Sequence, residues 1–166
     1  MLGEEQVGWL IDELVNESQR HALVVWVCPA PWNVDERAGT DQWGGFHEER
    51  VRIANAISGA NIHNLVMISG DWHLSAIDDG TNTGYADDGS RGFPLIHGGP
   101  LDRFAAGTGE PYSHGVFAQP GQFGTVRLSD SGGSTVAVTL TCHVWNGEVS
   151  TQLILEFVVP PGAQVL

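Results

Sequence analysis

The residues of this chain best suited to chemistry follow one apolar run, in the stretch LVMISGDWHLSAID at residues 65 to 78. Gly70 ends the run, and Asp71 and His73 come directly after it. Positions i and i+2 of an extended segment point to the same side, so this spacing predicts that the carboxylate and the imidazole converge on one point. An oxygen and a nitrogen ligand together suit zinc, iron or manganese, and the carboxylate also suits calcium. The motif therefore predicts part of a metal site.

A second interpretation gives the same two side chains a structural role. Asp71 would then cap a turn, with its carboxylate oxygens bonded to nearby backbone N–H groups, and His73 would be an ordinary loop histidine. Four residues alone do not separate these interpretations. They differ in a geometric property, namely whether the oxygens of Asp71 are occupied by the local backbone.

Two helices and two buried strands are predicted ahead of the motif. The helices, at about residues 2 to 18 and 46 to 59, have apolar residues at helical spacing. The strands, at residues 22 to 28 and 62 to 69, are continuous apolar runs, which is typical of strands buried on both faces. This order predicts a βαβ unit with parallel strands, and such sheets bind ligands beyond the carboxyl ends of their strands, where the motif lies.

The chain changes character at about residue 79. Residues 79 to 114 are rich in Gly, Asp, Ser and Thr without any period, so we expect a long, weakly ordered loop. It contains DDGTNTGYADDG, which has the composition of a calcium loop but not the EF-hand order, and His97 and His114, either of which could approach the motif. Three antiparallel strands are predicted after the loop, at about residues 123 to 130, 134 to 145 and 150 to 159.

Composition limits the classes of partner. Seven Lys and Arg against 20 Asp and Glu give a net charge of -13, which disfavours nucleic acid and anionic membrane surfaces. No run is long enough to span a membrane, and the acidic N-terminus is not a signal peptide. Cys28 and Cys142 lie in apolar or strand-like segments and are expected to be buried free thiols, while Trp32 and Trp43 either pack a loop or line a substrate cleft.

Six stretches support a family resemblance when they are taken in order. They are MLGEEQVGWLIDEL, CPAPW, DQWGGFHEERVRI, NLVMISGDWH, GGPLDRFAAGTGEPYS and GQFGTVRLSD. Over about residues 1 to 158 the chain resembles the second half of the PhoD-like alkaline phosphatases, which belong to the calcineurin-like metallophosphoesterases. Three features together carry the resemblance: the LGxxQxxWL start, the segment WGGFHEER that ends at Arg50, and GDxH.

The resemblance implies a fold, an activity and a site. The fold would be α/β, a partial metallophosphoesterase-type αββα sandwich, with residues 1 to 166 as the C-terminal half of a domain whose N-terminal half is absent. The activity would be hydrolysis of phosphate esters as an alkaline phosphatase or phosphodiesterase, with iron and calcium as metals, in an extracellular or periplasmic protein. Asp71 and His73 match the metal ligands of the family, and His73 would belong to the catalytic centre.

The rest of the family ligand set lies on earlier strands, which this chain does not contain. Two ligands do not hold a metal tightly, so we expect the isolated chain to be inactive. The rival hypothesis is a non-catalytic, β-rich binding or interaction module in which the GDWH turn is structural.

Overall fold

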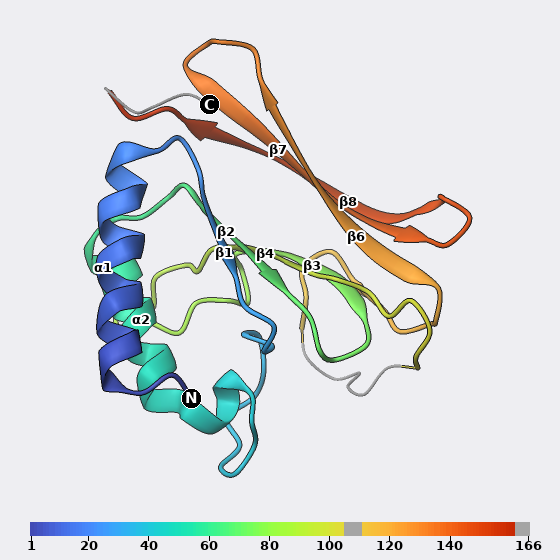
Figure 1. The fold of residues 1–166 in the computed structure, drawn as a ribbon, viewed down its shortest axis with the longest axis horizontal. Coiled ribbons are helices and arrows are strands. Elements are labelled where there is room, and N and C mark those ends of the chain that lie inside the picture. Colours follow the sequence, from blue (N-terminus) through green and yellow to red (C-terminus); the bar gives the residue numbers. More distant parts are fainter. Residues whose placement is uncertain (105–110, 162–166) are drawn as a thin grey trace.

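Two sheets and two helices form the part of the chain that the computed structural model describes, residues 1–104 and 111–161 (Figure 1). The elements are, in chain order, α1 (Glu4–Arg20), β1 (Val24–Val27), the 3-10 helix η1 (Trp43–Phe46), α2 (His47–Gly59), β2 (Leu65–Ser69), β3 (Ser75–Asp79), β4 (Pro94–His97), β5 (Val116–Phe117), β6 (Gln122–Asp130), β7 (Thr135–Val144) and β8 (Val149–Val158). The chain is therefore mixed α/β, as predicted.

The first sheet has the strand order β1-β2-β4-β3-β5. β1 and β2 pair in parallel, with Val24 opposite Leu65 and Val27 opposite Ile68, and α2 lies between them in the chain. The predicted βαβ unit is confirmed. The second sheet, β6-β7-β8, is antiparallel throughout, which confirms the three strands predicted for the tail.

The predicted loop at residues 79 to 114 is wrong in part, because β4 lies inside it. β4 pairs in parallel with β2 and antiparallel with β3, so a four-residue strand forms the centre of the sheet. The sequence PLIH is too short to show a period, and glycines and a proline surround it. β3 and β5 were also not predicted. Pairing with β2, from elsewhere in the chain, makes β4 a strand.

Alternation along the strands of the first sheet divides the apolar side chains between two cores. Leu65 and Met67 of β2 face the helices and belong to the core with α1 and α2. Val66 of β2 and Ile96 of β4 belong to the other core, with side chains from β7 and β8. The layers are therefore helices, five-stranded sheet and three-stranded sheet (Figure 1).

An aromatic cluster fills the helix-side core beside β1. Trp32 and Trp43 are fully buried, with ring centroids 5.1 Å apart, and Trp26 packs edge-on against both. The burial of both rings favours the interpretation that Trp32 and Trp43 fix the loop by packing.

The side chain of Arg50, from α2, is buried beside this cluster. Its Nη1 donates hydrogen bonds to the carbonyl oxygens of Trp32 (3.0 Å) and Val34 (2.7 Å), and its guanidinium lies 3.7 Å from the ring centroid of Tyr85. Burial lowers the pKa of Arg50, and nearby Tyr85 acts in the opposite direction. Arg50, the last residue of the segment WGGFHEER, thus orders the loop that follows β1.

Two expectations from composition can be checked directly. Cys28 and Cys142 are free and buried, as predicted, and burial raises the pKa of the Cys142 thiol to about 11. Among the described residues, no helix is long and apolar enough to cross a bilayer.

Replacing Arg50 by Met should destabilise the fold by about 3 kcal/mol, because two buried carbonyl oxygens lose their donor. Arg52→Met is the matched control, since Arg52 lies on the same helix and forms an exposed ion pair with Glu4. Its loss should cost about 1 kcal/mol or less. Urea unfolding of both variants measures the difference, and equal midpoints would contradict the proposed role of Arg50.

Candidate functional site

The ends of three parallel strands meet where the GDWH motif begins. After β1, the carbonyl oxygen of Pro29 accepts a hydrogen bond from the N–H of Gly70 (3.2 Å), and that of Ala30 accepts one from Oγ of Ser69 (3.1 Å). After β4, the N–H of Gly98 donates to the carbonyl oxygen of Ser69 (2.8 Å). The motif therefore leaves the sheet from the middle of its carboxyl edge, where α/β sheets place ligands.

The motif itself is a tight turn and not an extended segment. Asp71 has φ of 77° and His73 has φ of 52°, so both are left-handed although neither is glycine. Trp72 between them is buried, with 7% of its surface exposed. The prediction that alternation along an extended strand aligns Asp71 and His73 is therefore wrong in its mechanism. Left-handed backbone at residues with a Cβ is disfavoured by about 1 kcal/mol or more, and such strain is frequent at functional sites.

The carboxylate of Asp71 is exposed and accepts no hydrogen bond from the described part of the chain. A turn cap would use these oxygens on local backbone N–H groups. The capping interpretation of Asp71 is therefore contradicted. His73 is half-buried and also makes no hydrogen bond to a described residue, so both side chains can bind a ligand.

His97, at the end of β4, is the predicted loop histidine that reaches the turn. It is fully buried, and its Nε2 accepts a hydrogen bond from the N–H of Trp72 (3.3 Å). Burial lowers the pKa of His97 to about 4, and the neighbouring His73 acts in the same direction. In the sequence, His97 and two glycines follow a short apolar run, much as Ser69 and Gly70 follow another. This pattern is the signal that could have placed His97 at the end of a strand.

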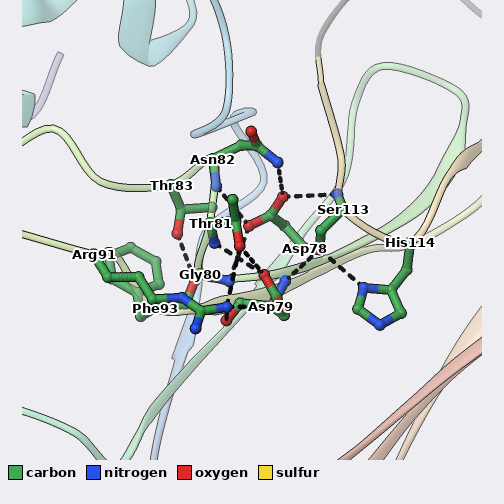
Figure 2. Close-up of polar contacts among 10 residues, drawn as sticks. All are labelled: Asp78, Asp79, Gly80, Thr81, Asn82, Thr83, Arg91, Phe93, Ser113 and His114. Carbon is green, nitrogen blue, oxygen red and sulfur yellow. Dashed lines mark hydrogen bonds and ion pairs between the residues drawn. The ribbon is translucent and has the colours of Figure 1, made fainter.

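The acidic loop forms a second polar cluster, built around Asp78 (Figure 2). Asp78 is fully buried, and its Oδ1 accepts hydrogen bonds from the N–H groups of Gly80 (2.9 Å) and Asn82 (3.0 Å). Its Oδ2 accepts from Nδ2 of Asn82 (2.7 Å) and the N–H of Ser113 (2.9 Å). Because backbone N–H groups and the Asn82 amide occupy both oxygens of Asp78, the resemblance of this loop to calcium loops is compositional at this carboxylate.

Asp79 and His114 complete this cluster (Figure 2). Asp79 forms an ion pair with Nη2 of Arg91 (2.6 Å) and accepts hydrogen bonds from the N–H and Oγ1 of Thr81. Nδ1 of His114 lies 2.9 Å from Oγ of Ser113. β3 begins beside the GDWH turn and ends at Asp79, so His114 belongs to the opposite end of that strand and not to the turn.

The GDWH turn is at most part of a metal site. Within residues 1–104 and 111–161, no three His, Cys, Asp or Glu side chains come together as a set that could hold a metal. Asp71 and His73 thus offer two suitable donors, and a tightly bound metal needs further ligands.

A comparison with known families covers most of the chain, including the turn. The sequence model of the PhoD-like phosphatases matches residues 1–143, which include both helices, the whole first sheet and the GDWH turn. The chain belongs to the PhoD-like phosphatase family. Within this PhoD-like chain, the matched region includes the unengaged side chains of Asp71 and His73.

The chain is also similar to two individual proteins. The PhoD-like chain is 32% identical over 80 residues to alkaline phosphatase D of Bacillus subtilis (strain 168), a match that covers 45% of this chain and 14% of that protein. A solved structure described as "Structure of PhoD" aligns with a TM-score of 0.47 at 18% identity, over 90% of this chain and 34% of that one. The chain therefore spans only a minor part of the relatives it matches.

Asp78→Asn should lower the free energy of unfolding by about 2 to 3 kcal/mol, because an amide NH2 cannot accept the bonds that the buried carboxylate accepts. Asp130→Asn is the control, since Asp130 accepts one hydrogen bond, from the N–H of Gly132 (2.7 Å), in an exposed turn. We expect a change of about 0.5 kcal/mol or less there. Thermal or urea unfolding compares the two, and similar losses would refute the structural role of Asp78.

Asp79 should make stability depend on pH. Burial alone would raise the pKa of Asp79, but hydrogen bonds from Thr81 and Arg91 outweigh burial and hold the pKa well below its ordinary value. A carboxyl whose pKa is lower in the folded state stabilises the fold above its unfolded pKa of about 4, and this contribution is lost as the pH falls toward the folded value. The stability difference between wild type and Asp79→Asn should therefore shrink between about pH 6 and about pH 3 in urea unfolding. A difference that stays constant would disprove this assignment.

Proposed function

We propose that this chain contributes one side of the metal centre of a phosphoester hydrolase, with Asp71 and His73 as metal ligands. The observation that supports this most directly is the state of the two side chains. They stand on left-handed backbone at the carboxyl edge of the sheet, and no described residue accepts from or donates to them. Membership of the PhoD-like phosphatase family points to the same reaction class.

The donor chemistry fits the metals of the proposal. An imidazole nitrogen and a carboxylate oxygen suit iron, and the exposed carboxylate of Asp71 also suits calcium. Bound metals of this kind acidify a coordinated water and offset negative charge on the phosphoryl oxygens. They would also let a chain of net charge -13 attract an anionic ester. His73 would hold its metal through a ring nitrogen, within the catalytic centre.

The remaining ligands would come from chain that adds to the free side of β1. Among the described strands, β1 pairs only with β2, and Val27 is 69% exposed at its end. A groove of about 470 Å³ runs between this strand and α1, where Trp9 is 58% exposed. A strand with its hydrogen-bonding edge open and apolar side chains beside it is suited to receive another strand.

A parallel strand added there would also end at the right place. Its carboxyl end would lie next to Pro29, and Pro29 accepts the hydrogen bond from Gly70 at the start of the GDWH turn. We therefore propose that the other half of the family domain extends the sheet at β1 and supplies the missing ligands. The partial αββα sandwich and a location outside the cytoplasm belong to the same proposal.

The test compares the chain alone with a protein that also carries the other half of the domain. We expect the 166-residue chain to hydrolyse p-nitrophenyl phosphate and bis-p-nitrophenyl phosphate no faster than buffer containing the same metals. In the longer protein, Asp71→Ala and His73→Ala should each remove at least one metal equivalent and lower kcat on the order of 100-fold or more. Metal analysis and initial rates measure both effects.

His63→Ala is the matched control, because His63 is an exposed histidine just before β2, at the opposite end of the strand that leads to the turn. It should keep wild-type metal content and rate. Unchanged metal content and rate in Asp71→Ala and His73→Ala would instead support the non-catalytic module. Metal-dependent turnover by the isolated chain would refute the need for a second half.

A further inference from the structure

The GDWH turn has an unfavourable backbone that something must hold in place. Asp71 and His73 are both left-handed, and a side chain with a Cβ disfavours that conformation at each of them. Neither side chain makes a hydrogen bond to a described residue, so neither stabilises its own conformation in that way. The constraint has to act through the residue between them.

Trp72 is that residue, and two contacts fix it. Its indole is buried in the helix-side core. Its backbone N–H donates to Nε2 of His97 (3.3 Å), across 25 positions of sequence. A hydrogen bond at this N–H restrains the peptide that joins Asp71 to Trp72, and with it the direction in which the Asp71 side chain leaves the turn.

The chemistry of His97 suits this one contact. A backbone N–H can only donate, so Nε2 must be unprotonated and the proton of the neutral ring must lie on Nδ1. That Nδ1 is buried and has no hydrogen-bond partner among the described residues. An apolar side chain of similar size would fill the space without burying an unpaired polar atom, so packing alone does not explain a histidine here.

The imidazole of His97, which accepts this hydrogen bond, lies at the end of a paired strand. His97 lies opposite Ser69 in the parallel pairing of β4 with β2, and Gly98 continues that pairing by donating to the carbonyl oxygen of Ser69. At Gly99 a Cβ would lie 2.2 Å from Oγ of Ser75, so the segment after His97 runs close against the start of β3. The imidazole is thus held between the strands on both sides of the turn.

We propose that His97 is a positioning residue, which holds the GDWH turn in its left-handed form so that Asp71 and His73 are presented to the metal centre. The part of this inference that concerns metal rests on the function proposed above. His97 is not itself assigned as a ligand, because Asp71, His73 and His97 do not come together as a set of three metal-binding side chains.

Two variants separate the acceptor from the volume of the side chain. His97→Gln places an amide oxygen near the position of Nε2, whereas His97→Leu keeps a similar size and removes the acceptor. In the 166-residue chain, the amide hydrogen of Trp72 should exchange about tenfold faster or more in His97→Leu, and within about threefold of wild type in His97→Gln. Amides of Val66 and Leu95, in the neighbouring strands, report in the same spectra that the sheet is intact.

The longer protein tests the consequence for the site. After reconstitution with iron and calcium salts, His97→Leu should weaken metal retention about 10-fold to 100-fold, and His97→Gln should recover most of it. If the amide hydrogen of Trp72 exchanges equally fast in wild type and His97→Leu, with the sheet intact, the hydrogen bond to His97 does not restrain the turn. Wild-type metal retention and rate in His97→Leu, where Asp71→Ala lowers both, would overturn the positioning role. If instead Asp71→Ala and His73→Ala leave metal content and rate unchanged, the proposed function fails. The exchange rate of the Trp72 amide hydrogen still shows whether His97 restrains the turn.

Discussion

Parallel pairing of β2 with a neighbour on each side is the constraint on which this structure depends. Parallel strands end at the same edge of a sheet, so the segments after β1, β2 and β4 meet there. The hydrogen bonds from Gly70 to Pro29 and from Gly98 to Ser69 follow from that meeting. A turn leaving the central one of three strands has neighbours on both sides, and one of them provides His97, which accepts a hydrogen bond from the turn.

The same constraint explains why two aspartates seven positions apart have different roles. Asp78 lies near the end of β3, where the chain turns tightly and backbone N–H groups surround the carboxylate, so it is buried and saturated with hydrogen bonds (Figure 2). Asp71 lies on the carboxyl edge, exposed and unengaged. Composition assigns the acidic loop and the GDWH motif similar metal-binding character, whereas hydrogen bonding distinguishes a structural carboxylate from one that can bind a ligand.

In the proposed function, the side of β1 that pairs with no described strand would link the sheet to the metal ligands. Two donors at the turn need further ligands, and the open side of β1 is the side from which a parallel strand would bring them to the same edge. Two exposed apolar residues beside that edge, Val27 of β1 and Trp9 of α1, fit the same arrangement. Under the proposed function, one added segment would extend the sheet and supply the ligands together.

Sequence by itself determined the elements whose signal is local. Helical spacing identified α1 and α2, apolar runs identified β1 and β2, and alternation identified β6 to β8. The GDWH motif made Asp71 and His73 candidate ligands, and that assignment stays a prediction. Tertiary structure alone decided β4, since a four-residue strand is defined by its pairing with distant β2. It also decided the left-handed turn, the contact of His97 with Trp72, and the buried roles of Arg50 and Asp78. Periodicity records which face of an element is apolar, whereas hydrogen bonds between segments 18 to 35 positions apart depend on how the strands are brought together.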